Sequence, residues 1–141
     1  MGTTSLVIVD AANVVGSVPD GWWRDRRGAA ERLRDRLVGY AEAGLPGWPG
    51  PVELVLVVEG AARGVAPVAG VRVDAAPGSG DDRIVELAAG RAPDRPCLVV
   101  TADRELRRRV EAHGARCVGP RAVRHPAGDA DAADAADEAA G

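Results

Sequence analysis

The sequence predicts an α/β protein built as a three-layer αβα sandwich, with helices on both faces of a mainly parallel sheet. Two observations support this prediction. Short apolar runs alternate along the chain with amphipathic helical patterns, which is typical of parallel sheets with right-handed crossovers. The longest runs are also almost uninterrupted by polar residues, as expected for strands that are buried on both faces.

Five segments have the length and composition of strands. The run 115–119 (ARCVG) is short, and the run 71–75 (VRVDA) alternates polar and apolar residues, which predicts a peripheral strand. We expect the Gly- and Pro-rich segments 44–51 and 60–70 to be connections within one domain. Three runs are almost entirely apolar and predict central strands: 6–10 (LVIVD), 53–60 (ELVLVVEG) and 97–101 (CLVVT).

Three segments repeat apolar residues at helical spacing, namely 29–43, 81–90 and 102–114. The second and third end at Gly90 and Gly114, and glycine commonly follows the last turn of a helix. No helical pattern directly follows the first strand, so we expect the aspartate at its end to cap no helix.

The chain of 141 residues is long enough for one domain with one sheet. We expect this domain to span residues 1–125. Residues 126–141 are rich in Ala and Asp without a large apolar side chain, which predicts a disordered tail. The formal net charge is −3, but five acidic residues lie in the tail, so the domain itself is mildly basic and compatible with a nucleic-acid partner.

The sequence favours a cytoplasmic protein that does not bind a membrane. No apolar run approaches the roughly 20 residues that span a bilayer, and the first residues lack the pattern of a secretory signal. Cys97 and Cys117 each lie in an apolar run without a second nearby cysteine, which predicts buried free thiols in a reducing compartment.

Acidic residues collect where the predicted strands end. Asp10 ends the first strand, Glu59 ends the second, and Asp103 follows the third long strand. Asp81 and Asp82 begin the helix after the peripheral strand. The carboxyl ends of parallel strands form the ligand-binding edge of such sheets, clustered carboxylates repel one another unless a cation is present, and oxygen ligands suit Mg²⁺ or Mn²⁺. The sequence therefore predicts a divalent-metal site.

Some of these residues have an ordinary structural explanation as well. An aspartate after a strand often caps the next helix, and Asp103 fits this role as well as that of a ligand. Asp81 or Asp82, taken alone, fits a helix N-cap better than a ligand. Asp10 has no such explanation, and a carboxylate at the end of a buried strand needs one.

Four segments, in order, resemble motifs of NYN-domain proteins of the YacP-like branch, within the wider PIN-like and FEN-like nuclease superfamily. They are 7–15 (VIVDAANVV), 59–64 (EGAARG), 77–88 (PGSGDDRIVELA) and 99–106 (VVTADREL). The resemblance extends from about Ser5 to Val123 and implies a PIN-like fold with a flavodoxin-like arrangement. It also implies hydrolysis of RNA phosphodiester bonds with Mg²⁺ or Mn²⁺, for which we expect endonucleolytic cleavage.

The resemblance assigns roles to individual residues. Asp10, Asp81 and Asp103 match the catalytic, metal-binding carboxylates of the family, and Asn13 matches an asparagine that would orient Asp10 or contact substrate. The sequence departs from the family at Ala102, where many relatives carry a polar residue, and at Glu59, where Asp is commoner. Three further residues match the family less closely: Asp82, Glu59 and Glu105. Of these, we expect Asp82 and Glu59 to be further metal ligands.

Arginines close to the predicted site are candidates for substrate binding. Arg24, Arg26 and Arg27 follow Trp22 and Trp23, and arginines beside exposed aromatic rings can hold an RNA backbone and stack bases. The tryptophans could instead cover the edge of the core. The helix after the third long strand offers two more candidates, which could also belong to a solvated helix face: Arg104 and Arg107.

One alternative to a nuclease stays open. A PIN-like module could bind RNA or a ribosome-associated partner without cutting it. The acidic residues disfavour this interpretation, because a protein that only binds a polyanion gains nothing from an acidic edge.

Overall fold

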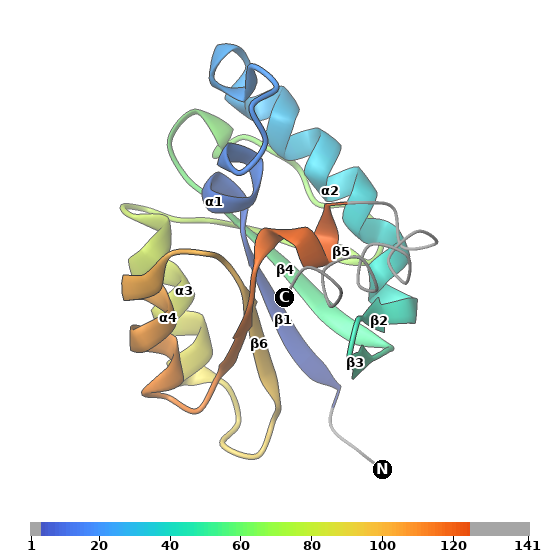
Figure 1. Cartoon of the computed structure of the whole chain (residues 1–141), viewed down its shortest axis with the longest axis vertical. Coiled ribbons are helices and arrows are strands. Elements are labelled where there is room, and N and C mark those ends of the chain that lie inside the picture. Colours follow the sequence, from blue (N-terminus) through green and yellow to red (C-terminus); the bar gives the residue numbers. More distant parts are fainter. Residues whose placement is uncertain (1–3, 125–141) are drawn as a thin grey trace.

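The computed structural model describes residues 4–124 (Figure 1). The predicted tail, residues 126–141, lies outside this range. The middle layer is a five-stranded sheet in which all neighbouring strands are parallel. In the order of the sheet its strands are β5 (Val71–Ala75), β4 (Val52–Val58), β1 (Ser5–Asp10), β6 (Cys97–Val100) and β7 (Arg116–Val118).

Helices cover both faces of this sheet, so the predicted αβα sandwich is confirmed (Figure 1). The side chains of Val7 and Val9 on β1 pack in one core with α1 (Ala11–Gly16) and α2 (Arg26–Ala43). Alternate residues of the same strand, Leu6 and Ile8, pack in a second core with α3 (Gly80–Gly90) and α4 (Arg104–Glu111). Both cores exist because successive side chains of a strand point to opposite faces.

Each predicted strand and helix is present, with some ends shifted. The long helix α2 begins three residues earlier than predicted because Asp25 caps it, accepting a hydrogen bond from the backbone N–H of Gly28 at 2.9 Å. Two short elements add a hairpin inside the predicted connection 44–51, namely β2 (Gly44–Leu45) and β3 (Trp48–Pro49). Residues 4–124 also contain three 3₁₀ helices: η1 (Trp22–Arg24), η2 (Gly60–Ala62) and η3 (Pro120–Val123).

The topology places a reversal of direction beside β1. The chain first builds outward from β1 to β4 and β5, and then returns to add β6 and β7 on the other side of β1. Counted along the chain, the strand order is 3-2-1-4-5, with the reversal between β1 and β6. Ligands of open α/β sheets bind at such a reversal, outside the carboxyl ends of the strands.

The two cysteines are free thiols, as predicted. Cys97 is buried, whereas the prediction of burial was wrong for Cys117, which is only half-buried. Burial raises the pKa of the Cys117 thiol to about 11, so the thiolate is disfavoured at neutral pH. Within residues 4–124, no helix combines the length and the apolar character that crossing a bilayer requires.

Candidate active site

Asp10 is the last residue of β1 and is only 4% exposed. Its carboxylate accepts hydrogen bonds from the Thr101 hydroxyl at 3.0 Å and from the backbone N–H of Asn13 at 3.4 Å. Asp10 is therefore the N-cap of α1, and the expectation that it caps no helix was wrong. Helix α1 has only six residues, of which Ala11 and Val14 are buried, too few to show a helical repeat in the sequence.

The surroundings of Asp10 oppose its ionisation. The pKa of this carboxyl is raised from 3.8 to about 6, chiefly by burial, although the hydrogen bonds from Thr101 and Asn13 act in the opposite direction. The negative charges of Asp81 and Glu59 contribute to this increase in the pKa. A buried carboxylate that is repelled by two others is a group that a cation would stabilise.

Thr101 connects two of the predicted metal ligands. This buried residue follows β6, where its hydroxyl donates to Asp10 and accepts a hydrogen bond from the backbone N–H of Asp103 at 3.2 Å. No sequence pattern assigned it a site role, although it lies in the segment 99–106 that resembles a family motif, two residues before Asp103. A hydroxyl at the end of a buried apolar run was the available signal.

Asn13 fixes the same region from the opposite side. Its Oδ1 accepts a hydrogen bond from the backbone N–H of Ala102 at 2.8 Å, which ties α1 to the loop after β6. Its backbone N–H holds Asp10, as described above. These bonds support an orienting role for Asn13, one of the two roles that its motif implied.

Asp103 and Asp81 approach the site from two further elements. The Asp103 carboxylate caps α4, accepting a hydrogen bond from the backbone N–H of Leu106 at 3.0 Å. The pKa of Asp81 is raised, chiefly by burial and then by the negative charges of Asp103 and Glu59. Helix α3 is capped by Ser79, whose hydroxyl accepts from a backbone N–H at 3.1 Å, so the interpretation of Asp81 or Asp82 as N-cap was wrong.

Glu59 directly follows β4 and lies against the start of α3. A Cβ atom placed on Gly80 would come within 2.8 Å of Glu59 Oε1, so any side chain at position 80 would push this carboxylate away. Because Gly80 has no side chain, the Glu59 carboxylate can lie against the start of α3, one residue before Asp81.

Asp10, Glu59, Asp81 and Asp103, here called the carboxylate rim, come from four segments at the carboxyl ends of β1, β4, β5 and β6. Asp81 and Glu59 raise the pKa of Asp10, and Asp103 and Glu59 raise the pKa of Asp81, so these carboxylates share one region. Among residues 4–124, however, no three acidic, His or Cys side chains are close enough to hold one metal ion directly. The all-oxygen rim fits Mg²⁺ or Mn²⁺ in its chemistry, and Mg²⁺ usually keeps several water ligands.

Two of the less closely matching carboxylates point elsewhere. Asp82 forms an ion pair with Arg109 at 2.9 Å, and Glu105 forms one with Arg108 at 2.9 Å. Both pairs are largely exposed. The structure therefore gives Asp82 a surface ion pair, although its negative charge still contributes to the raised pKa of Asp81.

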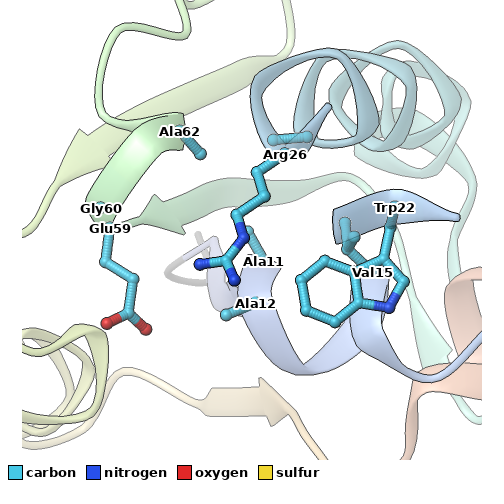
Figure 2. Close-up of a pocket in the computed structure, with 9 residues that line it drawn as sticks. Ala11, Ala12, Val15, Trp22, Arg26, Glu59, Gly60 and Ala62 are labelled. Atoms are coloured by element: carbon cyan, nitrogen blue, oxygen red, sulfur yellow. The ribbon is translucent and has the colours of Figure 1, made fainter. Parts of the chain in front are cut away.

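A pocket of about 280 Å³, here called the tryptophan pocket, lies beside the rim. Figure 2 shows the Arg26 guanidinium reaching from α2 into the space between Trp22 and Glu59. This guanidinium lies 5.4 Å from the centre of the Trp22 ring, within cation–π range. The remaining lining residues are small or apolar: Ala11, Ala12, Val15, Ala30, Gly60 and Ala62.

The tryptophans and their arginines form an accessible surface. Trp22 is half-buried, whereas Trp23 is 53% exposed and carries the Arg24 guanidinium 5.7 Å from its ring centre. The two rings meet edge to face, with centroids 6.2 Å apart. Within the described residues, neither tryptophan packs against the two cores, so these rings are available for contact with a ligand.

The other predicted arginines differ in their surroundings. Arg27 pairs with Glu31 at 3.6 Å on the surface of α2. Arg107 uses its Nε to donate to the carbonyl oxygen of Thr101 at 2.8 Å, so part of this side chain supports the site itself. Arg104 is exposed at the start of α4, next to Asp103.

Comparison with solved structures supports the fold. No family model matches the sequence, and no curated protein matches it. The crystal structure of Rae1 (YacP) from Bacillus subtilis superposes with a TM-score of 0.69 at 18% identity, covering 96% of this chain and 79% of that one. A mutant of the same protein gives a TM-score of 0.66 at 16% identity, with 96% and 80% covered. The chain therefore has the fold of the YacP-like NYN domain that its motifs predicted.

Proposed function

We propose that the protein is a divalent-metal-dependent ribonuclease that hydrolyses phosphodiester bonds of single-stranded RNA. The observation that supports this most directly is the state of Asp10, a buried carboxylate at the strand-order reversal that is destabilised by Asp81 and Glu59. An ionised group in such surroundings requires compensation. Bound Mg²⁺ or Mn²⁺ would provide it.

The residues of the rim have distinct tasks in this proposal. Asp10, Asp81 and Asp103 hold the cation with Glu59 as a further ligand, in part through its bound water molecules, because no three of these side chains are gathered for direct coordination within residues 4–124. Thr101 and Asn13 keep Asp10 and the loop before α4 in position through the hydrogen bonds described above. When bound, Mg²⁺ or Mn²⁺ supplies activation of water and charge neutralisation on the phosphate.

The tryptophan pocket offers a binding site for RNA next to these carboxylates. Arg26 provides a guanidinium that forms no ion pair within residues 4–124, and such a group binds phosphate oxygens well. The Trp22 ring provides a face on which an unpaired base can stack. Exposed Trp23 and Arg24 extend the same surface, where they could contact further nucleotides of a bound RNA strand.

One observation favours a second candidate, a module that binds RNA without cutting it. Within the described residues, no three potential ligands are gathered for direct coordination. Such a module would bind RNA through the arginines and tryptophans, and added Mg²⁺ would leave its thermal stability unchanged.

The decisive experiment is incubation of the purified protein with labelled single-stranded RNA and Mg²⁺ or Mn²⁺, with EDTA as control. Asp10→Asn tests the site, and Asp94→Asn is its matched control because exposed Asp94 lies before β6, at the opposite end of the sheet. We expect cleavage by the wild type and by Asp94→Asn only. Cleavage of a circular RNA would establish endonucleolytic action, and full activity of Asp10→Asn would contradict the proposal.

A further inference from the structure

A second pocket, of about 190 Å³, lies between α1, α2 and the residue that follows η3. Three arginines line it, namely Arg32 and Arg36 of α2 and Arg124, whereas Asp20 is its one acidic residue. We call it the arginine pocket. Its other lining residues are apolar: Val14, Val15, Val18, Ala29 and Leu33.

The guanidinium groups of this pocket are only partly satisfied. Arg124 Nε is buried without a hydrogen-bond acceptor, and Arg124 Nη2 reaches only the Ser17 hydroxyl oxygen at 3.5 Å. Arg36 Nε donates to the carbonyl oxygen of Val123 at 2.8 Å. Within residues 4–124, none of the three arginines forms an ion pair with a carboxylate.

Such an arrangement is unfavourable without an anion. A buried donor that forms no hydrogen bond is uncommon in proteins and often indicates an ion or a water molecule. Burial lowers the pKa of Arg36, Tyr40 and Asp20 act in the opposite direction, and the neighbouring charge of Arg124 makes a smaller contribution that lowers this pKa. An anion between the two guanidinium groups would satisfy Arg124 Nε and relieve the repulsion.

The arginine pocket is close to the candidate active site. Val15 of α1 lines both this pocket and the tryptophan pocket, so the two lie on adjacent sides of one short helix. Six helical residues span about 9 Å, and Asp10 caps this helix. A nucleic-acid strand held at the carboxylate rim can therefore reach the arginine pocket within a few nucleotides.

We infer that the arginine pocket is a second phosphate-binding subsite, which holds a backbone phosphate of the RNA a few nucleotides from the bond to be cut. The naming of RNA rests on the proposed function, whereas binding of a phosphate group rests on the pocket alone. The guanidinium group binds phosphate through paired N–H donors. The volume is below the roughly 300 Å³ of sites for drug-sized ligands, which favours a phosphate group over a whole nucleotide.

Titration with inorganic phosphate tests the pocket without RNA. In a ¹⁵N-labelled full chain, the arginine Nε–H resonances of Arg36 and Arg124 should shift with added phosphate, and the shift should be lost in Arg124→Gln. Arg72→Gln is the matched control, because Arg72 lies on the edge strand β5, pairs with Glu53 at 2.9 Å and does not line the arginine pocket. Unchanged resonances in the wild type, or equal shifts in Arg124→Gln, would overturn the inference.

Binding of a 20-nucleotide single-stranded RNA in EDTA, measured by fluorescence anisotropy at several salt concentrations, tests the assignment to RNA. Arg32→Gln and Arg124→Gln should each weaken binding roughly tenfold and reduce the salt slope by about 0.7, whereas Arg72→Gln should match the wild type. Exposed Arg32 provides the variant that folds if Arg124→Gln does not.

The outcomes separate this inference from the proposed function. Phosphate shifts without an effect on RNA affinity would assign the pocket to a free anion and refute the RNA subsite. Loss of affinity in a protein that never cleaves RNA with Mg²⁺ or Mn²⁺ would refute the ribonuclease while supporting the subsite.

Discussion

Asp10→Asn keeps the shape of a buried side chain and removes the charge that its surroundings oppose. Raising the pKa of this carboxyl from 3.8 to about 6 corresponds to about 3 kcal/mol of unfavourable ionisation at neutral pH. The Asn side chain can still accept from the backbone N–H of Asn13, but its amide nitrogen cannot accept from the Thr101 hydroxyl, which subtracts about 1 kcal/mol. We expect the metal-free variant to be more stable than the wild type by about 2 kcal/mol at pH 7.5.

The difference in stability between Asp10→Asn and the wild type should depend on pH in a defined direction. The pKa of Asp10 is higher in the folded protein than in the unfolded chain, so the folded protein binds more protons between pH 3.8 and about 6. Its stability therefore falls as the pH rises through that window. Below pH 3.8 the carboxyl is protonated in both states, and the advantage of Asp10→Asn should vanish or reverse because the lost hydrogen bond persists.

Urea unfolding in EDTA at pH 4, 5, 6 and 7.5 measures this difference in the free energy of unfolding. Added Mg²⁺ should stabilise the wild type and leave Asp10→Asn unchanged, because a ligand stabilises only the state that binds it. Asp94→Asn serves as the exposed control and should follow the wild type throughout. A variant that is less stable than the wild type at pH 7.5, or whose advantage does not depend on pH, would refute the electrostatic argument.

Three further predictions follow from the same structure. Thr101→Val should lower kcat/KM for RNA by roughly tenfold, as expected for loss of a residue that orients a ligand, and Thr101→Ser should restore most of it; equal losses would exclude the role of the hydroxyl. Arg26→Ala should weaken RNA binding and lower the salt slope by about 0.7, with no change in Mg²⁺ affinity measured by calorimetry. Leu37→Ala, at a fully buried position of α2, should destabilise the fold by about 3 kcal/mol in thermal unfolding followed by circular dichroism, and a change below about 1 kcal/mol would contradict its place in the core.

The positions of the strands and long helices could be predicted because they depend on periodicity. Buried parallel strands need continuous apolar runs, and a helix such as α2 needs apolar residues on one face. Helix α1 was missed because its six residues are held by the Asp10 cap and by packing, which leave no repeat. Ser79 was missed as the cap of α3 because two acidic residues follow it and offer the same signal.

Contacts between distant segments could not be predicted. The hydrogen bond from Thr101 to Asp10 joins residues 91 positions apart, and it forms because β6 pairs with β1. The bond from Ala102 to Asn13 depends on the same pairing. No local pattern states which strands are neighbours, since that follows from how all helices share the two faces of the sheet.

By itself, the sequence determined that carboxylates would follow the strands of a parallel α/β sandwich, because the apolar runs and the acidic residues after them are local features. Only the tertiary structure decided which of these residues share one region. Glu59 reaches the start of α3 because Gly80 leaves room for it, whereas Asp82 lies within reach of Arg109 and pairs with it. The arginine pocket arises in the same way, because the residue after η3 packs beside two arginines of α2. Long-range packing sets these distances, and electrostatic interactions depend on distance rather than on separation along the chain.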